Sequence, residues 1–336
     1  MTKRERLSAT IAGQPVDRLP VSLWRHFYCE ETTRAGLVAA MLAWQKTYDW
    51  DFLKINPRAG YHAEDWGNRY AFSGNGHIEP ALVRSAVRSP EDFGRIARLD
   101  PAGKAGRPAP VLADHLGAVA DLRKALGPDE PMLMTVFTPM SVAAELAGGP
   151  QGLAATIVRD PAAVHAALRA ITDTYADFAA RTIDAGADGI FLATTHCATR
   201  ANFTDQQYAE FGRPYDLEVL AAVRAAPLNL LHVCRAQAMV RELADYPVAM
   251  LNWDTADLTN PPLALMARAV AGKALAGGLD RKLFTAHGGA AALATQADDA
   301  RRAMAGRPFV LASTCTIDAR SDPEAVKAVR ESVDNS

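Results

Sequence analysis

The sequence lacks the features of a membrane, secreted or nucleic-acid-binding protein. It has no uninterrupted apolar stretch long enough to span a bilayer, and its basic start, "MTKRERLSATIAG", precedes no apolar core of signal-peptide length. The formal net charge is only -2, so the chain lacks the excess of positive charge that is typical of proteins binding nucleic acid or an anionic membrane. We therefore expect a cytoplasmic protein that acts on a small molecule and binds neither nucleic acid nor membrane.

Cysteine is also scarce. The 336 residues include 4 cysteines, too few for a disulfide scaffold. In a reducing compartment, isolated cysteines direct attention to metal-binding or catalytic roles. Two of them end apolar runs, Cys234 in "LLHVCRA" (230–236) and Cys315 in "LASTCT" (311–316).

A glycine-rich turn is missing after the first β-rich run, "LPVSLW", which "RHFYCEE" follows. A doubly wound dinucleotide-binding sheet would need that turn. Instead, eight short apolar runs alternate with alanine-rich amphipathic segments, and this alternation predicts a (β/α)8 TIM barrel, an α/β fold, as a single domain over residues 1–336. The eight runs are residues 19–24, 50–56, 131–137, 188–194, 228–233, 248–253, 273–278 and 308–313.

Residues 60–130 are too long for a simple connection between the second and third runs. They include "GNRYAFSGNGHIEP" and the proline-rich "DPAGKAGRPAPVLADHL". Loops of this length inside compact domains are uncommon and usually functional. We expect this segment to form an excursion over the barrel mouth.

Polar side chains end nearly every predicted strand. In a barrel the carboxyl ends of all strands open on one face, so His232, Cys234 and Cys315 can meet although they are far apart in sequence. Zinc prefers thiolate and imidazole ligands, and a catalytic zinc keeps three protein ligands and one exchangeable position. The pattern alone also allows ordinary packing, because buried cysteine often behaves as a small hydrophobic residue.

Other strand ends supply candidate catalytic and substrate-binding residues. Asp254 could fill the fourth metal position at rest, or serve as a helix N-cap or as a partner of His232. His196 could position substrate or transfer a proton, although a packed histidine explains it equally well. Candidate substrate-binding residues also follow the strands, with the basic ones suited to an anionic group or to structural ion pairs. These are Arg25, His26, Asn56, Arg58 and Trp253.

Three stretches resemble the uroporphyrinogen decarboxylase superfamily. They are "RERLSATIAGQPVDRLPVSLW" near the start, "VFTPMSVAAELAGG" after the third run and "LASTCTIDARSDPEAVKAV" near the end. The resemblance covers essentially the whole chain and implies a (β/α)8 barrel with its site at the carboxyl ends of the strands.

The tetrapyrrole decarboxylases of this superfamily resemble one another at positions where this chain differs. They carry an arginine-rich early loop, an aspartate after the second strand, a tyrosine after the third and a histidine after the last. The corresponding stretches here hold only Arg25, Asn56, Ala144 and Cys315. A decarboxylase-like lyase is therefore the alternative function. For that function, the chain lacks the residues with which the resemblance implies that decarboxylases hold their substrate.

The other branch comprises zinc-dependent methyltransferases that move a methyl group from a corrinoid protein to a thiol. Its His-x-Cys pair after strand five and its cysteine after strand eight match His232, Cys234 and Cys315, while Thr314 replaces the usual glycine. The resemblance implies zinc, a methylated corrinoid supplied by a partner protein, and a small thiol acceptor. Tetrahydrofolate remains open as the carrier, and a non-catalytic binding barrel is a further alternative.

Overall fold

The computed structural model describes residues 1–104 and 106–334, and its centre is a sheet of eight parallel strands that is nearly closed into a barrel. The spatial order is β1-β12-β11-β10-β9-β8-β7-β2, so the first and last barrel strands of the chain are neighbours. Seven of the eight runs expected from the sequence contain one of these strands, and the run 273–278 overlaps the eighth, which ends one residue later. The strands are β1 (Val21–Ser22), β2 (Leu53–Ile55), β7 (Met132–Phe137), β8 (Gly189–Ala193), β9 (Leu230–Val233), β10 (Met250–Trp253), β11 (Ala274–Leu279) and β12 (Phe309–Ser313).

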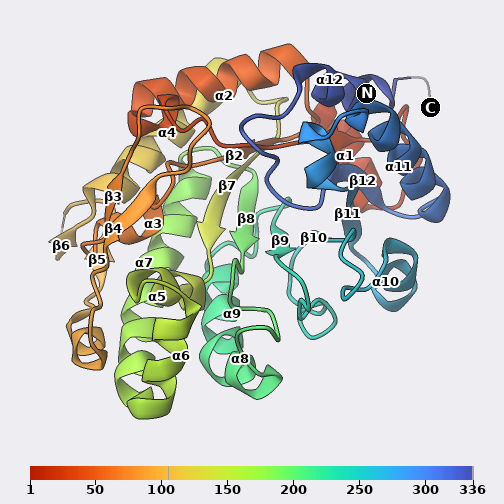
Figure 1. Cartoon of the computed structure of the whole chain (residues 1–336). Helices are drawn as coiled ribbons and strands as arrows, with labels where there is room; N and C mark the ends of the chain where they lie inside the picture. The colour runs from red at the N-terminus through yellow and green to blue at the C-terminus, as the bar shows by residue number, and fades with distance from the viewer. Residues whose placement is uncertain (105, 335–336) are drawn as a thin grey trace.

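Helices surround the barrel strands (Figure 1). The longest, α7 (Pro161–Asp184), begins where the Asp160 side chain accepts the Ala163 N–H, with proline in the first turn. The others are α1 (Lys3–Ile11), α2 (Arg34–Tyr48), α3 (Tyr61–Glu64), α4 (Pro110–Leu126), α5 (Pro139–Leu146), α6 (Pro150–Arg159), α8 (Asp205–Phe211), α9 (Arg213–Ala222), α10 (Leu263–Ala269), α11 (Gly289–Ala303) and α12 (Pro323–Glu331), with the 3-10 turns η1 (Glu30–Thr32), η2 (Pro90–Arg95) and η3 (Arg281–Thr285).

Successive side chains of each barrel strand point to opposite faces, so the strands contribute to two separate hydrophobic cores. Side chains that point outward pack against the helices, whereas a smaller cluster fills the barrel interior and includes Trp24, Phe52 and Phe191. Lys54 follows Phe52 by two residues in β2, so it shares the inward face of that strand. The interior is therefore a packed core whose carboxyl end becomes polar.

The segment between β2 and β7 differs in part from expectation. Residues 59–104 and 106–108 form the excursion, with the pairs β3 (Arg69–Ala71) and β4 (Ala81–Arg84), and β5 (Leu99–Asp100) and β6 (Arg107–Pro108). These strands lie to one side of the barrel (Figure 1), and residues near β3 and β4 reach its mouth. Residues 110–126, however, form α4, which packs beside α2. The expected range of 60–130 was thus too wide, because its last part is an outer helix of the barrel.

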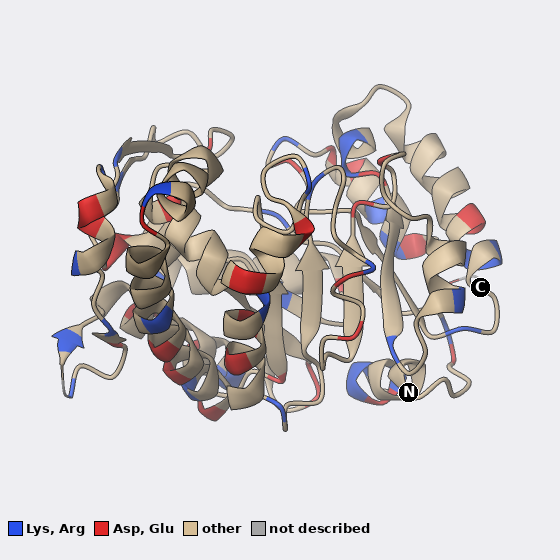
Figure 2. Cartoon of the chain, turned by 90° about the horizontal axis from the view of Figure 1, so that it is seen from below, with Lys and Arg blue, Asp and Glu red and all other residues tan. Residues whose placement is uncertain are grey.

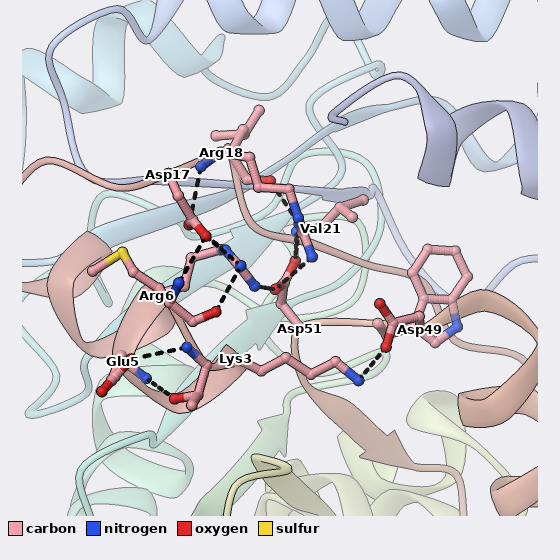
Figure 3. Close-up of polar contacts among 12 residues, drawn as sticks. Lys3, Glu5, Arg6, Asp17, Arg18, Val21, Asp49 and Asp51 are labelled. Carbon is pink, nitrogen blue, oxygen red and sulfur yellow. Dashed lines mark hydrogen bonds and ion pairs between the residues drawn. The ribbon is translucent and has the colours of Figure 1, made fainter. Parts of the chain in front are cut away.

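Asp51 joins the two strands that flank the seam of the sheet. β1 and β2 do not pair as strands, but the Asp51 N–H donates to the Val21 carbonyl at 3.0 Å and the Asp51 carboxylate accepts the Val21 N–H at 2.8 Å. This carboxylate is fully buried, and the guanidinium groups of Arg6 and Arg18 each reach it at 2.7 Å (Figure 3). One buried and one largely buried guanidinium group and one strand end therefore depend on a single carboxylate.

No helix of the described residues is both long enough and apolar enough to cross a bilayer. Basic and acidic residues are interspersed along the outer helices in the view of Figure 2, in keeping with the small net charge.

Replacing Asp51 with asparagine should destabilise the fold strongly. The change leaves Arg6 and Arg18 buried with less compensation, and removing one partner of a buried ion pair costs roughly 3–5 kcal/mol. The measurement is the free energy of unfolding in urea. Asp49→Asn is the matched control, because Asp49 also contacts two cations, Lys3 and Arg330, but its side chain is 59% exposed and should matter by less than about 1 kcal/mol. Equal losses for the two variants would contradict this account of the seam.

Candidate metal centre

A cavity of about 910 Å³ opens at the carboxyl ends of the strands. Its walls come from the strand ends, from the excursion and from the loop after β12. Five of the eight histidines of the chain line it, namely His26, His62, His77, His196 and His232. Such a concentration of titratable groups in one concave site is typical of a binding or catalytic centre.

The structure brings His232, Cys234 and Cys315 together in this cavity. Their ligand atoms all lie within 4.8 Å of one another, and the two sulfur atoms are 3.6 Å apart. Two thiolates bound tetrahedrally at 2.3 Å would be separated by about 3.8 Å. Within residues 1–104 and 106–334, this is the one group of histidine, cysteine and acidic side chains with such a spacing. The sulfur atoms are thus already spaced as metal ligands require.

Asn252 fixes the ring of His232. The two residues are paired in register on β10 and β9, and the Nδ1–H of His232 donates to Oδ1 of Asn252 at 2.5 Å. The opposite nitrogen, Nε2, is buried and has no hydrogen-bond partner. A buried nitrogen without a partner costs free energy unless a ligand occupies it, so the tautomer and the bare Nε2 both fit a metal ligand.

The two thiols influence each other's ionisation. The pKa of Cys315 lies well below its usual range because the S–H of Cys234 donates to it, with a further contribution from His232. The pKa of Cys234 is raised, first by this same hydrogen bond and then by burial. Of the two thiols, Cys315 therefore ionises more readily than Cys234.

Strained backbone flanks the cysteine pair. Arg235, directly after Cys234, has φ 79°, and Thr195, at the end of the neighbouring strand, has φ 44°. Non-glycine residues in this region cost of order 1 kcal/mol or more and concentrate at functional sites. Thr194 supports the bend, since its hydroxyl accepts the N–H of Cys234 at 3.4 Å.

His196 lines the cavity as the sequence led us to expect. Its Nε2 accepts a hydrogen bond from the Arg235 guanidinium at 2.8 Å. Burial, and then the charge of Arg235, lower the pKa of His196 below its usual value. A neutral imidazole beside the cysteine pair is consistent with the proton-transfer or positioning role expected for it.

Two of the expected substrate-binding residues also line the cavity, and each has an acidic partner. His26 Nδ1 lies 3.0 Å from the buried carboxylate of Glu31 and its ring stacks on Tyr28. Arg58 forms an ion pair with Glu64. Both side chains are therefore held in place before any ligand arrives.

Arg25 and Trp253 do not line this cavity, contrary to expectation. The Arg25 guanidinium donates to the Ala319 carbonyl and lies over the rings of Phe27 and Trp44, on the side of α2. Trp253 follows Asn252 by one residue, so it points outward into the helix layer, where its Nε1–H donates to the Pro261 carbonyl. Both residues lie at strand ends as expected, but their side chains point away from the cavity.

Asp254 and Asn56 are also absent from the cavity wall. The Asp254 carboxylate accepts the N–H of Ala256 at 3.2 Å and so caps its own turn, and the partner of His232 is Asn252 instead. Asn56 is buried and accepts a hydrogen bond from the Lys54 ammonium. The charge of Cys315 also acts on Asp254, so its role as a fourth ligand stays a prediction, and Asn56 contacts Lys54 rather than the cavity.

Sequence reasoning missed Lys54, Asn252 and Arg281, all of which bear on the site. Lys54 and Arg281 line the cavity, and Asn252 orients His232. A usable signal existed for Lys54, since a lysine within the strongly apolar run "WDFLKIN" must either point inward with Phe52 or interrupt the outer core.

Comparisons with known proteins identify the family and support the fold. The uroporphyrinogen decarboxylase (URO-D) family profile matches residues 2–336. No curated protein matches the chain. Among solved structures, a methyltransferase from Methanosarcina mazei superposes with a TM-score of 0.80 at 20% identity, covering 100% of this chain and 99% of that one. A B12-independent methionine synthase from Shewanella sp. W3-18-1, in complex with selenomethionine, has a TM-score of 0.57 at 12% identity and covers 93% and 94% of the two chains. At these identities the structures support the TIM-barrel fold, and the family profile establishes that the chain belongs to the uroporphyrinogen decarboxylase family.

Proposed function

We propose that this protein is a zinc-dependent methyltransferase that moves a methyl group between a corrinoid protein, or another activated methyl carrier, and a thiol or folate acceptor. One observation carries the proposal, namely the cavity-facing trio of His232, Cys234 and Cys315 with a bare, buried Nε2. The solved methyltransferase and methionine synthase that share the fold are consistent with methyl transfer.

The donor set favours zinc. One imidazole nitrogen and two sulfur atoms suit this ion, and three protein ligands leave a fourth position for an exchangeable group. When bound, zinc would hold a thiol as a thiolate at neutral pH while leaving its sulfur nucleophilic. At rest this position would be filled by water or by Asp254, which caps its own turn through one carboxylate oxygen only, and substrate would replace either one.

The remaining residues have roles that follow from their positions. Asn252 holds the His232 ring through Nδ1, which leaves Nε2 available to an ion, and Cys234 and Cys315 would supply the thiolates. His196, kept neutral by burial and by Arg235, can orient the acceptor or exchange a proton with it. Arg58 and His26 present polar groups to the rest of the ligand. A corrinoid would be delivered at the mouth by a partner protein.

A decarboxylase activity gains no support from the site. The position after the last strand, where the resemblance places a histidine in decarboxylases, holds Cys315, and Arg25 lies against α2 outside the cavity. A non-catalytic binding barrel predicts that the protein lacks either the ion or access to it. Metal analysis combined with a screen of methyl donors, beginning with free methylcobalamin, and of thiol and folate acceptors separates these possibilities.

Cys234→Ser and Cys315→Ser should each lower bound zinc and abolish methyl transfer together, because serine is a poor zinc ligand. Zinc content is measured by elemental analysis after reconstitution, and transfer by loss of the methylcobalamin absorbance. Cys197→Ser is the matched control, since Cys197 is fully buried but lies outside the trio. A purely structural role for the pair would instead give all three variants normal activity and modestly reduced stability.

Asn252→Ala should weaken zinc binding about 10- to 100-fold, because partners that orient a ligating histidine contribute on this scale. Affinity is measured by competition with a chelator. Asn229→Ala is the control, since Asn229 is also buried and hydrogen-bonded but stands just before β9, at the opposite end of the barrel. If both variants keep the native affinity, Asn252 has no role in the centre.

A further inference from the structure

Lys54 is a buried amine that faces the cavity without a carboxylate partner. Its side chain comes from β2 and is 5% exposed. The Nζ atom donates to Oδ1 of Asn56 at 2.5 Å and lies 4.6 Å from the centre of the Phe191 ring. Among the described residues it forms no ion pair. An ammonium in such a place is costly unless a negative charge approaches it.

Lys54 and the candidate metal-binding trio share an aromatic neighbour. The Phe191 ring that lies beside Nζ also packs against the His232 ring, with their centres 5.3 Å apart. The charges that act on Lys54 come from Cys315, after β12, and from Glu31, in η1. Glu31 is already engaged by His26 and by the N–H groups of Phe27 and Ala59. The ionisation of Lys54 is therefore sensitive to charge at the trio.

Thiol binding would add a negative charge at this place. A divalent ion held by two thiolates and a neutral imidazole has no net charge, and a third thiolate makes the group anionic. The thiol must also lose its proton when it binds, since a metal ligand is the thiolate. A nearby amine that takes up this proton satisfies both requirements.

We propose that Lys54 is the proton acceptor for the thiol substrate. The S–H bond breaks as the sulfur binds the ion, the proton passes to the neutral Nζ of Lys54, directly or through water, and the resulting ammonium balances the new thiolate. This inference rests on the proposed function. It is supported by burial, which lowers the pKa of Lys54 to about 7, so that near neutral pH the amine is available in both forms.

The test counts protons released when 2-mercaptoethanol binds the zinc-loaded protein, by calorimetry in buffers of different ionisation enthalpy. At pH 6, Lys54 is already protonated, so the wild type should release about one proton per thiol. At pH 8 the amine is neutral and takes that proton, so the release should fall well below one. A purely structural Lys54 would not produce this change with pH.

Three variants sharpen the measurement. Lys54→Met should fold, because an apolar residue of similar length replaces an unpaired buried amine, and it should release about one proton at both pH values. Lys54→Arg keeps a permanent positive charge, so it should also release about one proton at both values while retaining thiol affinity. Lys46→Met, at an exposed lysine of α2, should behave as the wild type.

Proton counts that are the same in the wild type and Lys54→Met at pH 8 would overturn this role for Lys54 while leaving the methyltransferase proposal intact. Failure of the zinc-loaded protein to bind the thiol would overturn both. A separate measurement needs neither zinc nor thiol. Reductive ¹³C-methylation should yield one dimethyl-lysine signal that titrates near pH 7 and is missing in Lys54→Met, and titration of that signal near the usual lysine value would contradict the proposal.

Discussion

The geometry of the candidate centre depends on the side chain of Asn252. Its Oδ1 holds the His232 ring, while its Nδ2 donates to the carbonyls of Ala276 on β11 and Ser313 on β12. The buried amide of Asn252 therefore connects β9, which carries His232 and leads into Cys234, with β12, which leads into Cys315. Because Cys315 follows Ser313 by two residues, any shift of β12 relative to β9 would strain these three hydrogen bonds. The spacing of the sulfur atoms is in this way controlled by the barrel itself.

The opposite side of the site depends on the seam. β2, which carries Lys54, is not paired with β1, so the position of Lys54 relative to Cys315 is set partly by the contacts of Asp51 with Val21, Arg6 and Arg18. These contacts lie before the start of β2, whereas the cavity lies beyond its end. A buried ion cluster at one end of the barrel thus supports a buried, unpaired amine toward the other.

Much of the architecture could be predicted from the sequence, because it follows from patterns with a strict period. Alternating apolar runs and helices fixed the eight strands, and the convergence of strand ends in a barrel brought His232, Cys234 and Cys315 together. The direction in which side chains point at the strand ends was harder to predict from the sequence. Arg25 turns toward Trp44, and Asp254 caps a turn, because local contacts after a strand ends override the alternation within it. Asn252 and Lys54 were missed because a polar residue inside an apolar run reveals its role only when its spatial neighbours are known.

Membership of the uroporphyrinogen decarboxylase family does not by itself select the chemistry, because a TIM barrel supports many reactions through changes at its strand ends. The side chains at the cavity distinguish this chain. Cys315 stands where the resemblance places a histidine in decarboxylases, Arg58 is already paired with Glu64, and Arg25 lies over aromatic rings outside the cavity. Lys54 is buried beside Phe191, and among the described residues it forms no ion pair. A thiolate formed near the trio would bring a negative charge to this amine, so the position of Lys54 and the choice of candidate ligands are consistent with the same proposed reaction.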